Sequence, residues 1–213
     1  IASILPSLDT LHVTLNGYPD VPDFLLHPKI VVHRSQETGD LGDAGKFYGA
    51  GATRGYYLAL DDDIVYPPDF VWTLLNTLRG ERARGRKVAV GLHGKVMPPR
   101  VEHYYGGHVR QYHGAHALAE ARPVHVLATC GLVYHTDDLP LTMADFAGPR
   151  NMADIHFSIA CQRHQVGCMV IPRPDGYIRI QPIPVEQTIW GQYHRNDQAQ
   201  TDLFNSWRDW RLY

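Results

Sequence analysis

The feature that most constrains the fold is a short apolar run that leads directly into three carboxylates. Residues 56–60 read Tyr-Tyr-Leu-Ala-Leu, and Asp61, Asp62 and Asp63 follow. A continuous apolar run of this length is typical of a strand buried on both faces in an α/β protein. Two prolines come shortly after the carboxylates, and the apolar spacing beyond them predicts a helix over residues 69–79.

The rest of the chain alternates in the same way between strand-like and helix-like segments. The alternation indicates an α/β layered domain with a mostly parallel central sheet. We find no internal repeat and no dividing linker, so we expect one domain over residues 1–213. Further strands are predicted over residues 11–16, 29–33, 87–92, 124–134 and 168–171, a turn and short helix over 39–47, a helix over 151–165, and an irregular segment over 97–123.

Composition excludes several classes of protein. With 213 residues and 44% hydrophobic side chains, the chain can bury a core without a disulfide or metal staple. No apolar stretch reaches the length of a membrane span, so we expect no transmembrane segment. The net charge of −2 argues against a broad nucleic-acid surface. Three cysteines without a C-x-x-C pair, and no signal peptide, favour free thiols and a cytoplasmic location.

The three adjacent carboxylates need a physical explanation, because like charges in contact cost stability unless a cation or hydrogen-bond donors offset them. Side chains at the carboxyl end of a strand in an open α/β sheet reach the ligand crevice. A divalent cation that joins Asp61–Asp63 to a diphosphate would account for the arrangement. The alternative is a solvated acidic turn that caps the following helix.

Four segments together are similar to a known family. Leu58–Pro68, which contains the three aspartates, resembles the Asp-x-Asp segment of family 2-like glycosyltransferases with the GT-A fold. Gly39–Phe47 lies where these enzymes place a loop and helix against the donor nucleotide. Leu127–Gly131 resembles the strand that lines the acceptor side, and Asn151–Phe157 resembles the helix start that supplies the base. The resemblance covers about residues 9–205.

The resemblance implies a metal-dependent enzyme with Mn²⁺ or Mg²⁺ as cofactor. It would move a sugar from a nucleotide-sugar donor to a glycan or other hydroxyl acceptor. Asp63 would be the direct metal ligand, and Asp61 would face the ribose or base of the nucleotide or share the metal. Asp62 could do either. Lys46, or the turn around Asp43, could contact the nucleotide.

An inverting transfer also needs a general base for the acceptor hydroxyl. Asp154 is the candidate by its match to the family's base motif, although Ala153 precedes it where the family has an acidic residue. Helix capping is the other explanation for Asp154. Asp137 and Asp138 are the alternative pair. His194 is a candidate metal ligand, since some GT-A enzymes complete the metal site with a late histidine.

The resemblance also implies an organisation and a setting. Residues 1–96 would form the donor and metal half, and residues 97–213 the acceptor half with a C-terminal tail. GT-A enzymes have a strand and a helix before the segment that residues 11–16 resemble. We therefore expect that the chain lacks the first strand of this Rossmann-like fold and belongs to a larger protein. Surface polysaccharide synthesis, at or near the inner membrane surface, is the expected role.

Two alternatives remain at this point. A nucleotidyltransferase of similar fold also uses paired aspartates and a metal, and a basic glycine-rich phosphate loop near the first strand would favour it. A non-catalytic module that binds a glycan or nucleotide within a larger protein is the alternative from another class.

Overall fold

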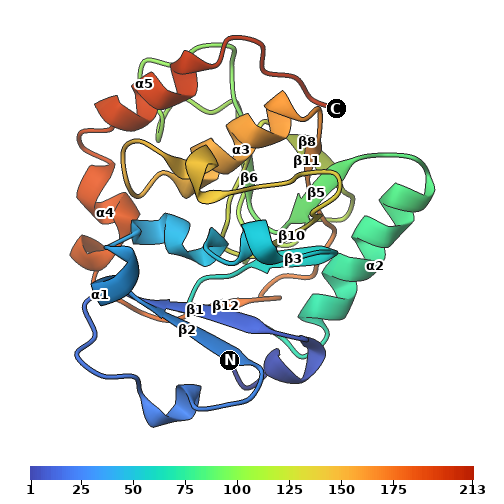
Figure 1. Ribbon diagram of the computed structural model, residues 1–213. Coiled ribbons are helices and arrows are strands. Elements are labelled where there is room, and N and C mark those ends of the chain that lie inside the picture. Colours follow the sequence, from blue (N-terminus) through green and yellow to red (C-terminus); the bar gives the residue numbers. More distant parts are fainter.

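The computed structural model describes residues 1–213 and centres on a five-stranded sheet (Figure 1). Its strands are β3 (Tyr56–Ala59), β5 (Val88–Gly91), β8 (Arg122–Val124), β10 (Leu132–His135) and β11 (Gly167–Val170). Their order across the sheet is β3-β10-β5-β11-β8. All four residues of the central strand β5 are buried. The predicted α/β class and the apolar strands near residues 56–60, 87–92 and 168–171 are thus confirmed.

The sheet is mixed, whereas a mostly parallel sheet was expected. Only β5 and β11 are parallel neighbours. Strand β10 is antiparallel to both β3 and β5, and β8 is antiparallel to β11. The physical reason lies in the connections, because parallel neighbours require a long crossover while antiparallel strands do not. Strand β10 enters the sheet from a non-helical segment and runs against its neighbours.

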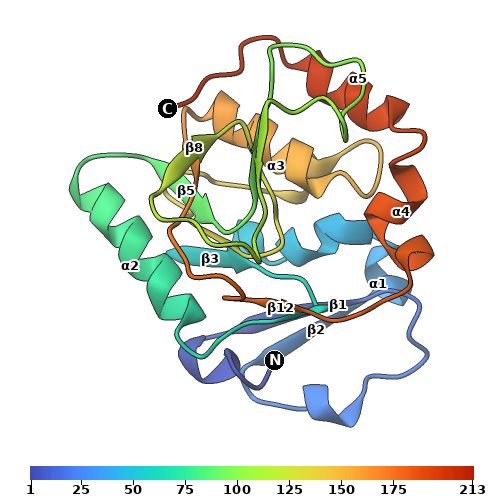
Figure 2. The same ribbon diagram turned by 180° about the vertical axis from the view of Figure 1, so that it is seen from behind.

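Helices cover the two faces of this sheet (Figures 1 and 2). On one face lies α2 (Phe70–Ala83), where Leu74 shares a buried apolar cluster with Val90 of β5. On the other lies α3 (Ala153–Arg163), where Phe157 belongs to a second buried cluster. Successive side chains of a strand point to opposite faces, so the central strands supply both clusters. Both helices were predicted, with bounds that differ by a few residues.

A separate pair of parallel strands lies beside the sheet. These are β1 (Leu11–Leu15) and β2 (Ile30–Arg34), as the sequence predicts, and neither pairs with the five-stranded sheet. A 3-10 helix over Gly42–Phe47 joins the pair to the rest of the molecule. The hydroxyl of Thr14 donates to the carbonyl of Gly45 at 2.9 Å. A Cβ at Gly45 would lie 2.9 Å from the Thr14 methyl, so this approach requires glycine.

The predicted strand over residues 124–134 is wrong as a single element. The segment is divided among β8, β9 (Val126–Leu127) and β10, which lie in two different sheets. Gly131 has a φ of 144°, a conformation that few residues other than glycine adopt, and it allows the chain to turn before β10. The segment over 97–123 contains β7 (Arg110–Tyr112) and the start of β8. The remaining elements are β4 (Ile64–Val65), β6 (Gly94–Val96), β7 (Arg110–Tyr112), β9 (Val126–Leu127), β12 (Arg179–Ile180), α1 (Ser35–Thr38), α4 (Ile189–Tyr193) and α5 (Gln198–Ser206).

The C-terminal helix α5 (Gln198–Ser206) anchors the end of the chain. Phe204 is fully buried, and its ring stacks on Trp210 at 4.6 Å between centroids. All three cysteines are free. The longest helix, α2, has 14 residues, and no helix is both long and apolar enough to cross a bilayer.

Candidate functional site

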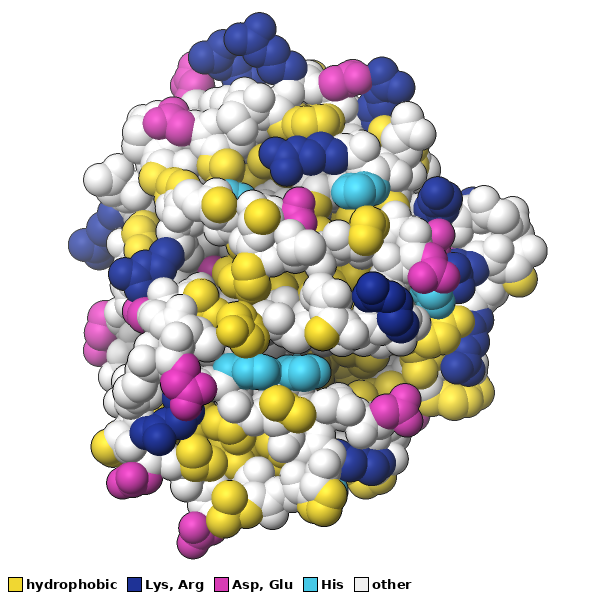
Figure 3. Space-filling view, in the orientation of Figure 1, with side chains coloured by type: hydrophobic (Ala, Val, Ile, Leu, Met, Phe, Trp, Pro, Cys, Tyr) yellow, Lys and Arg dark blue, Asp and Glu magenta, His cyan; other side chains and the backbone are white.

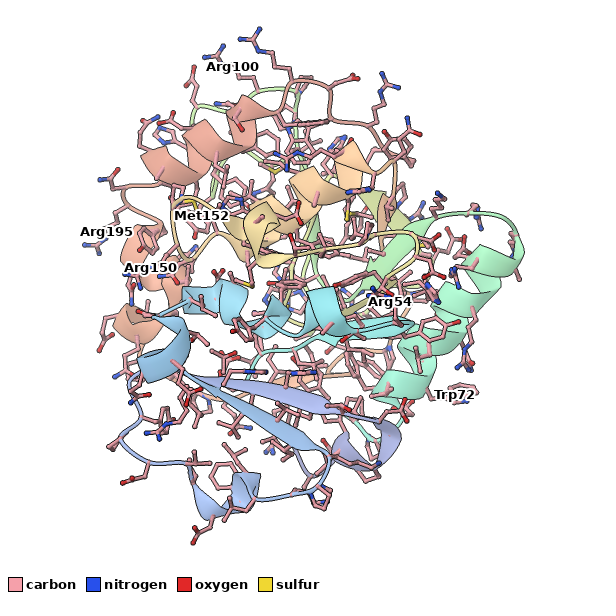
Figure 4. The ribbon with its side chains drawn as sticks, viewed as in Figure 1. Arg54, Trp72, Arg100, Arg150, Met152 and Arg195 are labelled. Carbon is pink, nitrogen blue, oxygen red and sulfur yellow. The ribbon has the colours of Figure 1, made fainter.

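A cavity of about 1720 Å³ lies between the β1–β2 pair and the five-stranded sheet. Its wall includes β1, residues 54–58, the three aspartates and the start of α3. Figure 4 labels two of the lining residues, Arg54 just before β3 and Met152 just before α3. In the space-filling view a hollow opens beside two neighbouring histidines (Figure 3). The predicted site residues can therefore be placed relative to one large cavity.

Asp61, Asp62 and Asp63 all line this cavity. The buried Tyr66 fixes the turn that carries them. Its hydroxyl accepts a hydrogen bond from the Asp61 backbone N–H at 2.9 Å and donates one to the Cys130 carbonyl at 3.0 Å. Burial raises the pKa of Asp63, and repulsion from Asp61 and Asp62 adds to the effect. The strand end thus presents partly desolvated negative charge to the cavity.

Lys46 neutralises one of these carboxylates. Its ammonium group forms an ion pair with Asp61, and the Lys46 side chain is only 17% exposed. Burial alone would lower the pKa of Lys46, but the carboxylates of Asp61, Asp154 and Asp43 outweigh burial and raise it. Lys46 therefore stays charged at the centre of three acidic groups. No ion pair reaches Asp62 or Asp63.

Asp154 lies in the first turn of α3 and is held by a residue of a different segment. One carboxylate oxygen, Oδ1, accepts hydrogen bonds from the backbone N–H of Thr129 at 2.7 Å and from its hydroxyl at 2.8 Å. The Thr129 hydroxyl also receives a longer contact, 3.4 Å, from the Lys46 ammonium. The Asp154 carboxylate makes no hydrogen bond to a backbone N–H of its own helix, although it lies in the first turn of α3.

Asp43 provides the capping instead. Its Oδ2 accepts a hydrogen bond at 2.9 Å from the backbone N–H of Ala153, the first residue of α3. Its other oxygen is buried without a hydrogen-bond partner. Burial raises the pKa of Asp43 to about 6; the bond from Ala153 lowers it and the Asp154 carboxylate raises it further. The expectation that the turn around Asp43 contacts a nucleotide stays a prediction. One oxygen of Asp43, Oδ2, already accepts the hydrogen bond from α3.

His194 lies apart from the aspartates. It follows α4, its ring stacks on Trp190 at 4.1 Å, and its Nδ1 lies 2.9 Å from the Trp190 carbonyl oxygen. Trp190 lines the cavity but His194 does not. No group of three histidine, cysteine, aspartate or glutamate side chains is arranged to hold a metal. The structure therefore does not assemble Asp61, Asp63 and His194 into one preformed ligand set.

The alternative carboxylates Asp137 and Asp138 lie outside the cavity wall. Asp138 accepts a hydrogen bond from the Nε of Arg82 at 2.7 Å, which ties the end of β10 to α2. Asp137 is exposed and lies 3.6 Å from the ring of His135. Both belong to a surface turn, whereas Asp154 lines the cavity.

Two further residues of the cavity wall, Lys95 and Thr129, were not predicted as site residues from the sequence. The ammonium of Lys95 sits 4.5 Å from the ring centre of Tyr104 and 5.2 Å from that of Tyr105, in the cavity wall. Burial lowers the pKa of Lys95, although the Asp154 carboxylate acts in the opposite direction. The sequence held a signal for Lys95, because this residue lies three positions beyond the end of the predicted strand over 87–92.

No protein-family model matches the chain, and no curated protein matches it either. Function therefore has to be inferred from these residues and their geometry.

Proposed function

We propose that the chain is the catalytic part of a metal-dependent glycosyltransferase with a GT-A-like fold. The donor would be a nucleotide sugar, and the acceptor a glycan or another hydroxyl compound. One observation carries the proposal. The carboxylates that end a buried strand, Asp61–Asp63, line the same large cavity as Asp154, a carboxylate that two hydrogen bonds hold in place. An anionic donor and a hydroxyl acceptor need these two kinds of group.

The Lys46–Asp61 ion pair distinguishes the three aspartates by how far their charge is compensated. Lys46 already compensates Asp61, whereas Asp63 is partly desolvated and has no cationic partner. A carboxylate with a raised pKa and unbalanced charge gains most from a bound cation. Asp63 is therefore the first choice as metal ligand, and Asp62 the second. The Lys46–Asp61 pair would face the nucleotide part of the donor.

These residues fit Mg²⁺ or Mn²⁺ without a third protein ligand. Mg²⁺ is commonly held by one or two carboxylates together with substrate phosphates, and it retains water in its remaining positions. Asp63 with Asp61 or Asp62 would hold such an ion. When bound, the ion supplies positive charge that offsets the charge developing on the diphosphate leaving group. His194 has no necessary part in this arrangement.

Asp154 would accept the proton of the acceptor. The Thr129 bonds occupy Oδ1, and no protein donor reaches Oδ2, which leaves this oxygen free for the substrate. The acceptor oxygen would attack the anomeric carbon as its proton passes to Oδ2. The bond from that carbon to the diphosphate oxygen breaks, and the nucleoside diphosphate leaves. A single displacement of this kind inverts the anomeric centre.

The proposed division of the chain and its biological setting rest on the resemblance to family 2-like glycosyltransferases alone. Residues 1–96 would bind the donor and residues 97–213 the acceptor. The product would be a surface polysaccharide, made on the cytoplasmic side at or near the inner membrane.

The test is turnover of a panel of nucleotide sugars with Mn²⁺ or Mg²⁺, followed by release of nucleoside diphosphate. Activity should require the metal and fall at least about a hundredfold in Asp63→Asn, since a transition-state charge contact is lost. The matched control is Asp20→Asn, which removes an exposed carboxylate outside the cavity and should leave the rate unchanged. Full metal-dependent activity in Asp63→Asn would refute the site assignment.

The same assay separates the alternatives. Pyrophosphate release from a nucleoside triphosphate and a sugar phosphate would identify a nucleotidyltransferase. Binding of nucleotide without any turnover would identify a binding module. The loop over Gly39–Phe47 offers one basic side chain, Lys46, and Asp61 already holds it, so no observation favours the nucleotidyltransferase.

A further inference from the structure

We propose that the acceptor carries a carboxylate, as a uronic acid does, and that Lys95 binds this group beside the candidate base. The inference rests on the proposed function where it calls the ligand an acceptor, and it adds the chemical class of that acceptor. Two features of the cavity wall carry it. One is a half-buried lysine without an anionic partner, and the other is a buried glutamine with unused hydrogen-bond capacity.

Four lysine or arginine side chains line the cavity, and Lys95 differs from the other three. Lys46 is paired with Asp61, and Arg54 and Arg79 are exposed to water. Lys95 is half-buried and takes part in no ion pair. Burial lowers its pKa, because the charged form is poorly solvated at this position. An anion bound from the cavity would stabilise that charge.

Two tyrosine rings position the Lys95 ammonium group without neutralising it. The ring centres of Tyr104 and Tyr105 lie 4.5 and 5.2 Å from its nitrogen. The face of an aromatic ring attracts a cation through its quadrupole but carries no net charge. The backbone N–H of Tyr104 donates to the Thr201 hydroxyl at 3.0 Å. That of Tyr105 donates to the carboxylate of Asp197, the N-cap residue of α5, at 2.8 Å. The start of α5 therefore fixes the rings that hold the cation.

The ammonium group of Lys95 also lies within electrostatic reach of Asp154. The Asp154 carboxylate opposes the effect of burial on the pKa of Lys95. Burial raises the pKa of Tyr104 and of Tyr105, and the same carboxylate adds to the rise. No ion pair joins Lys95 to Asp154, and both residues line the cavity, so one ligand can contact both. An acceptor whose hydroxyl meets Asp154 would place a neighbouring substituent at Lys95.

Gln200 of α5 provides the second observation. The residue is 1% exposed and lines the cavity, and neither atom of its side-chain amide has a hydrogen-bond partner in the protein. A buried amide without a partner costs stability, and a hydrogen bond to a ligand would offset that cost. Gln200 precedes Thr201, which binds the backbone of Tyr104, so it belongs to the same corner of the cavity. Because the amide is covered, its bond to a ligand requires a change of side-chain rotamer.

The balance of charge selects a carboxylate among the groups that an acceptor could carry. Lys95 supplies a single positive charge, which a neutral sugar would leave uncompensated. A phosphate monoester carries about −1.5 to −2 at pH 7 and would bring excess negative charge close to Asp154. A carboxylate has one charge and two oxygens, one for the ammonium group and one for the N–H of an amide such as Gln200. A sugar of the uronic acid class therefore fits this corner.

The test is a binding titration followed by NMR at about pH 7, on the whole chain without metal or nucleotide sugar. The probes are the methyl glycosides of glucuronic and galacturonic acid, compared with methyl glucoside and methyl galactoside. We expect at least one uronoside to bind at least about tenfold more tightly than its neutral counterpart, because it gains charge-assisted hydrogen bonds. The resonances of Tyr104, Tyr105 and Gln200 should shift on binding.

Variants assign the effect to single side chains. Lys95→Met keeps the length of the side chain and removes its charge, so it should abolish the preference, and Lys95→Gln is a second uncharged variant. The matched control, Lys87→Met, removes an exposed lysine outside the cavity and should leave the preference unchanged. Gln200→Leu should weaken uronoside binding severalfold with an equal or higher Tm, since it replaces an unpartnered buried amide. A purely structural glutamine would instead give a lower Tm.

A preference that is lost in both Lys95 variants and kept in Lys87→Met supports the proposal. Equal affinity for charged and neutral glycosides, no binding of any glycoside, or a preference that survives in the Lys95 variants would overturn it. Tighter binding of methyl glucoside 6-phosphate than of either uronoside would overturn the choice of a carboxylate.

The titration involves no turnover, so the two proposals fail separately. A preference that depends on Lys95, together with full activity in Asp63→Asn, would refute the enzyme site alone. Sugar transfer that depends on Asp63, without any preference for uronosides, would refute the present inference alone.

Discussion

At the scale of single residues, the acidic side chains around the cavity differ by the partner each one has. Lys46 holds Asp61, Thr129 holds Asp154, the α3 backbone holds one oxygen of Asp43, and no ion pair reaches Asp63. The four carboxylates therefore differ in the cation or hydrogen-bond donor that compensates their charge. In the proposed function, Asp63 is therefore the carboxylate that binds a cation, and Asp154 is the one that accepts a proton.

Thr129 should act as a positioning residue for Asp154. Thr129→Val keeps the backbone N–H but removes the hydroxyl, so Asp154 loses one of its two fixed donors. We expect kcat to fall about tenfold or more with the donor KM nearly unchanged, since a positioned base contributes about 10²–10⁴-fold. Steady-state kinetics measure this split. Thr129→Ser should restore the rate, and an equal loss in Ser would indicate a packing role.

Asp43 should make stability depend on pH. Its pKa is about 6 in the folded chain against an ordinary 3.8, so between these values the native state binds more protons than the unfolded state. Stability should therefore fall as pH rises from about 4 to 6 and stay lower above that. Asp43→Asn keeps an acceptor for Ala153 and removes the charge. We expect it to be about 1–2 kcal/mol more stable than the wild type at pH 7.5 and about equal at pH 4.

Denaturant unfolding at the two pH values checks this expectation. Asp43→Ala serves as the comparison, because it removes the charge together with the cap of α3, which is worth about 1 kcal/mol. A gain in Asn that does not vary with pH would contradict the assignment.

At the scale of elements, the packing of α3 against α5 positions the start of α3 at the cavity wall. The N-terminal end of α3 carries Asp154 to the cavity wall, and its other face packs against α5 through a buried cluster that contains Ile155, Ile159 and Phe204. The side chain of Asn205 in α5 also binds both backbone groups of Val101. The C-terminal helix thus supports the candidate base from behind.

Phe204→Ala should therefore destabilise the chain strongly. The ring is fully buried and stacks on Trp210, and truncation of such a phenylalanine costs about 3–5 kcal/mol. Asp202→Ala, on the exposed side of the same helix, should cost no more than about 0.5 kcal/mol. Chemical denaturation of the two variants measures the difference. Similar losses in both would mean that α5 is held by its surface contacts.

At the scale of the whole molecule, the β1–β2 pair is a weakly attached layer. Its residues are mostly half-buried, whereas every residue of β5 is buried. The 3-10 helix over Gly42–Phe47 and the buried Ile4 connect this layer to the sheet. The large cavity lies along the boundary between the layer and the sheet.

Native-state hydrogen exchange should resolve these two layers. The ladder amides of β2 should exchange at least about a hundredfold faster than those of β5, because local opening costs least where few apolar contacts are lost. Mass-spectrometric exchange on the chain alone measures both strands in one experiment. Equal protection would show that the two layers unfold together.

The sequence by itself determined the α/β class, most of the strands, both long helices and the strand end that carries Asp61–Asp63. These features depend on local periodicity and on prolines and glycines, which act over a few residues. It could not determine the pairing of Lys46 with Asp61, of Thr129 with Asp154, or of Asp43 with Ala153. These partners are 15, 25 and 110 residues apart, so their contact depends on how the elements pack. The direction of β10 was likewise decided by the tertiary structure, because chain connections and not local patterns fix which strands become neighbours.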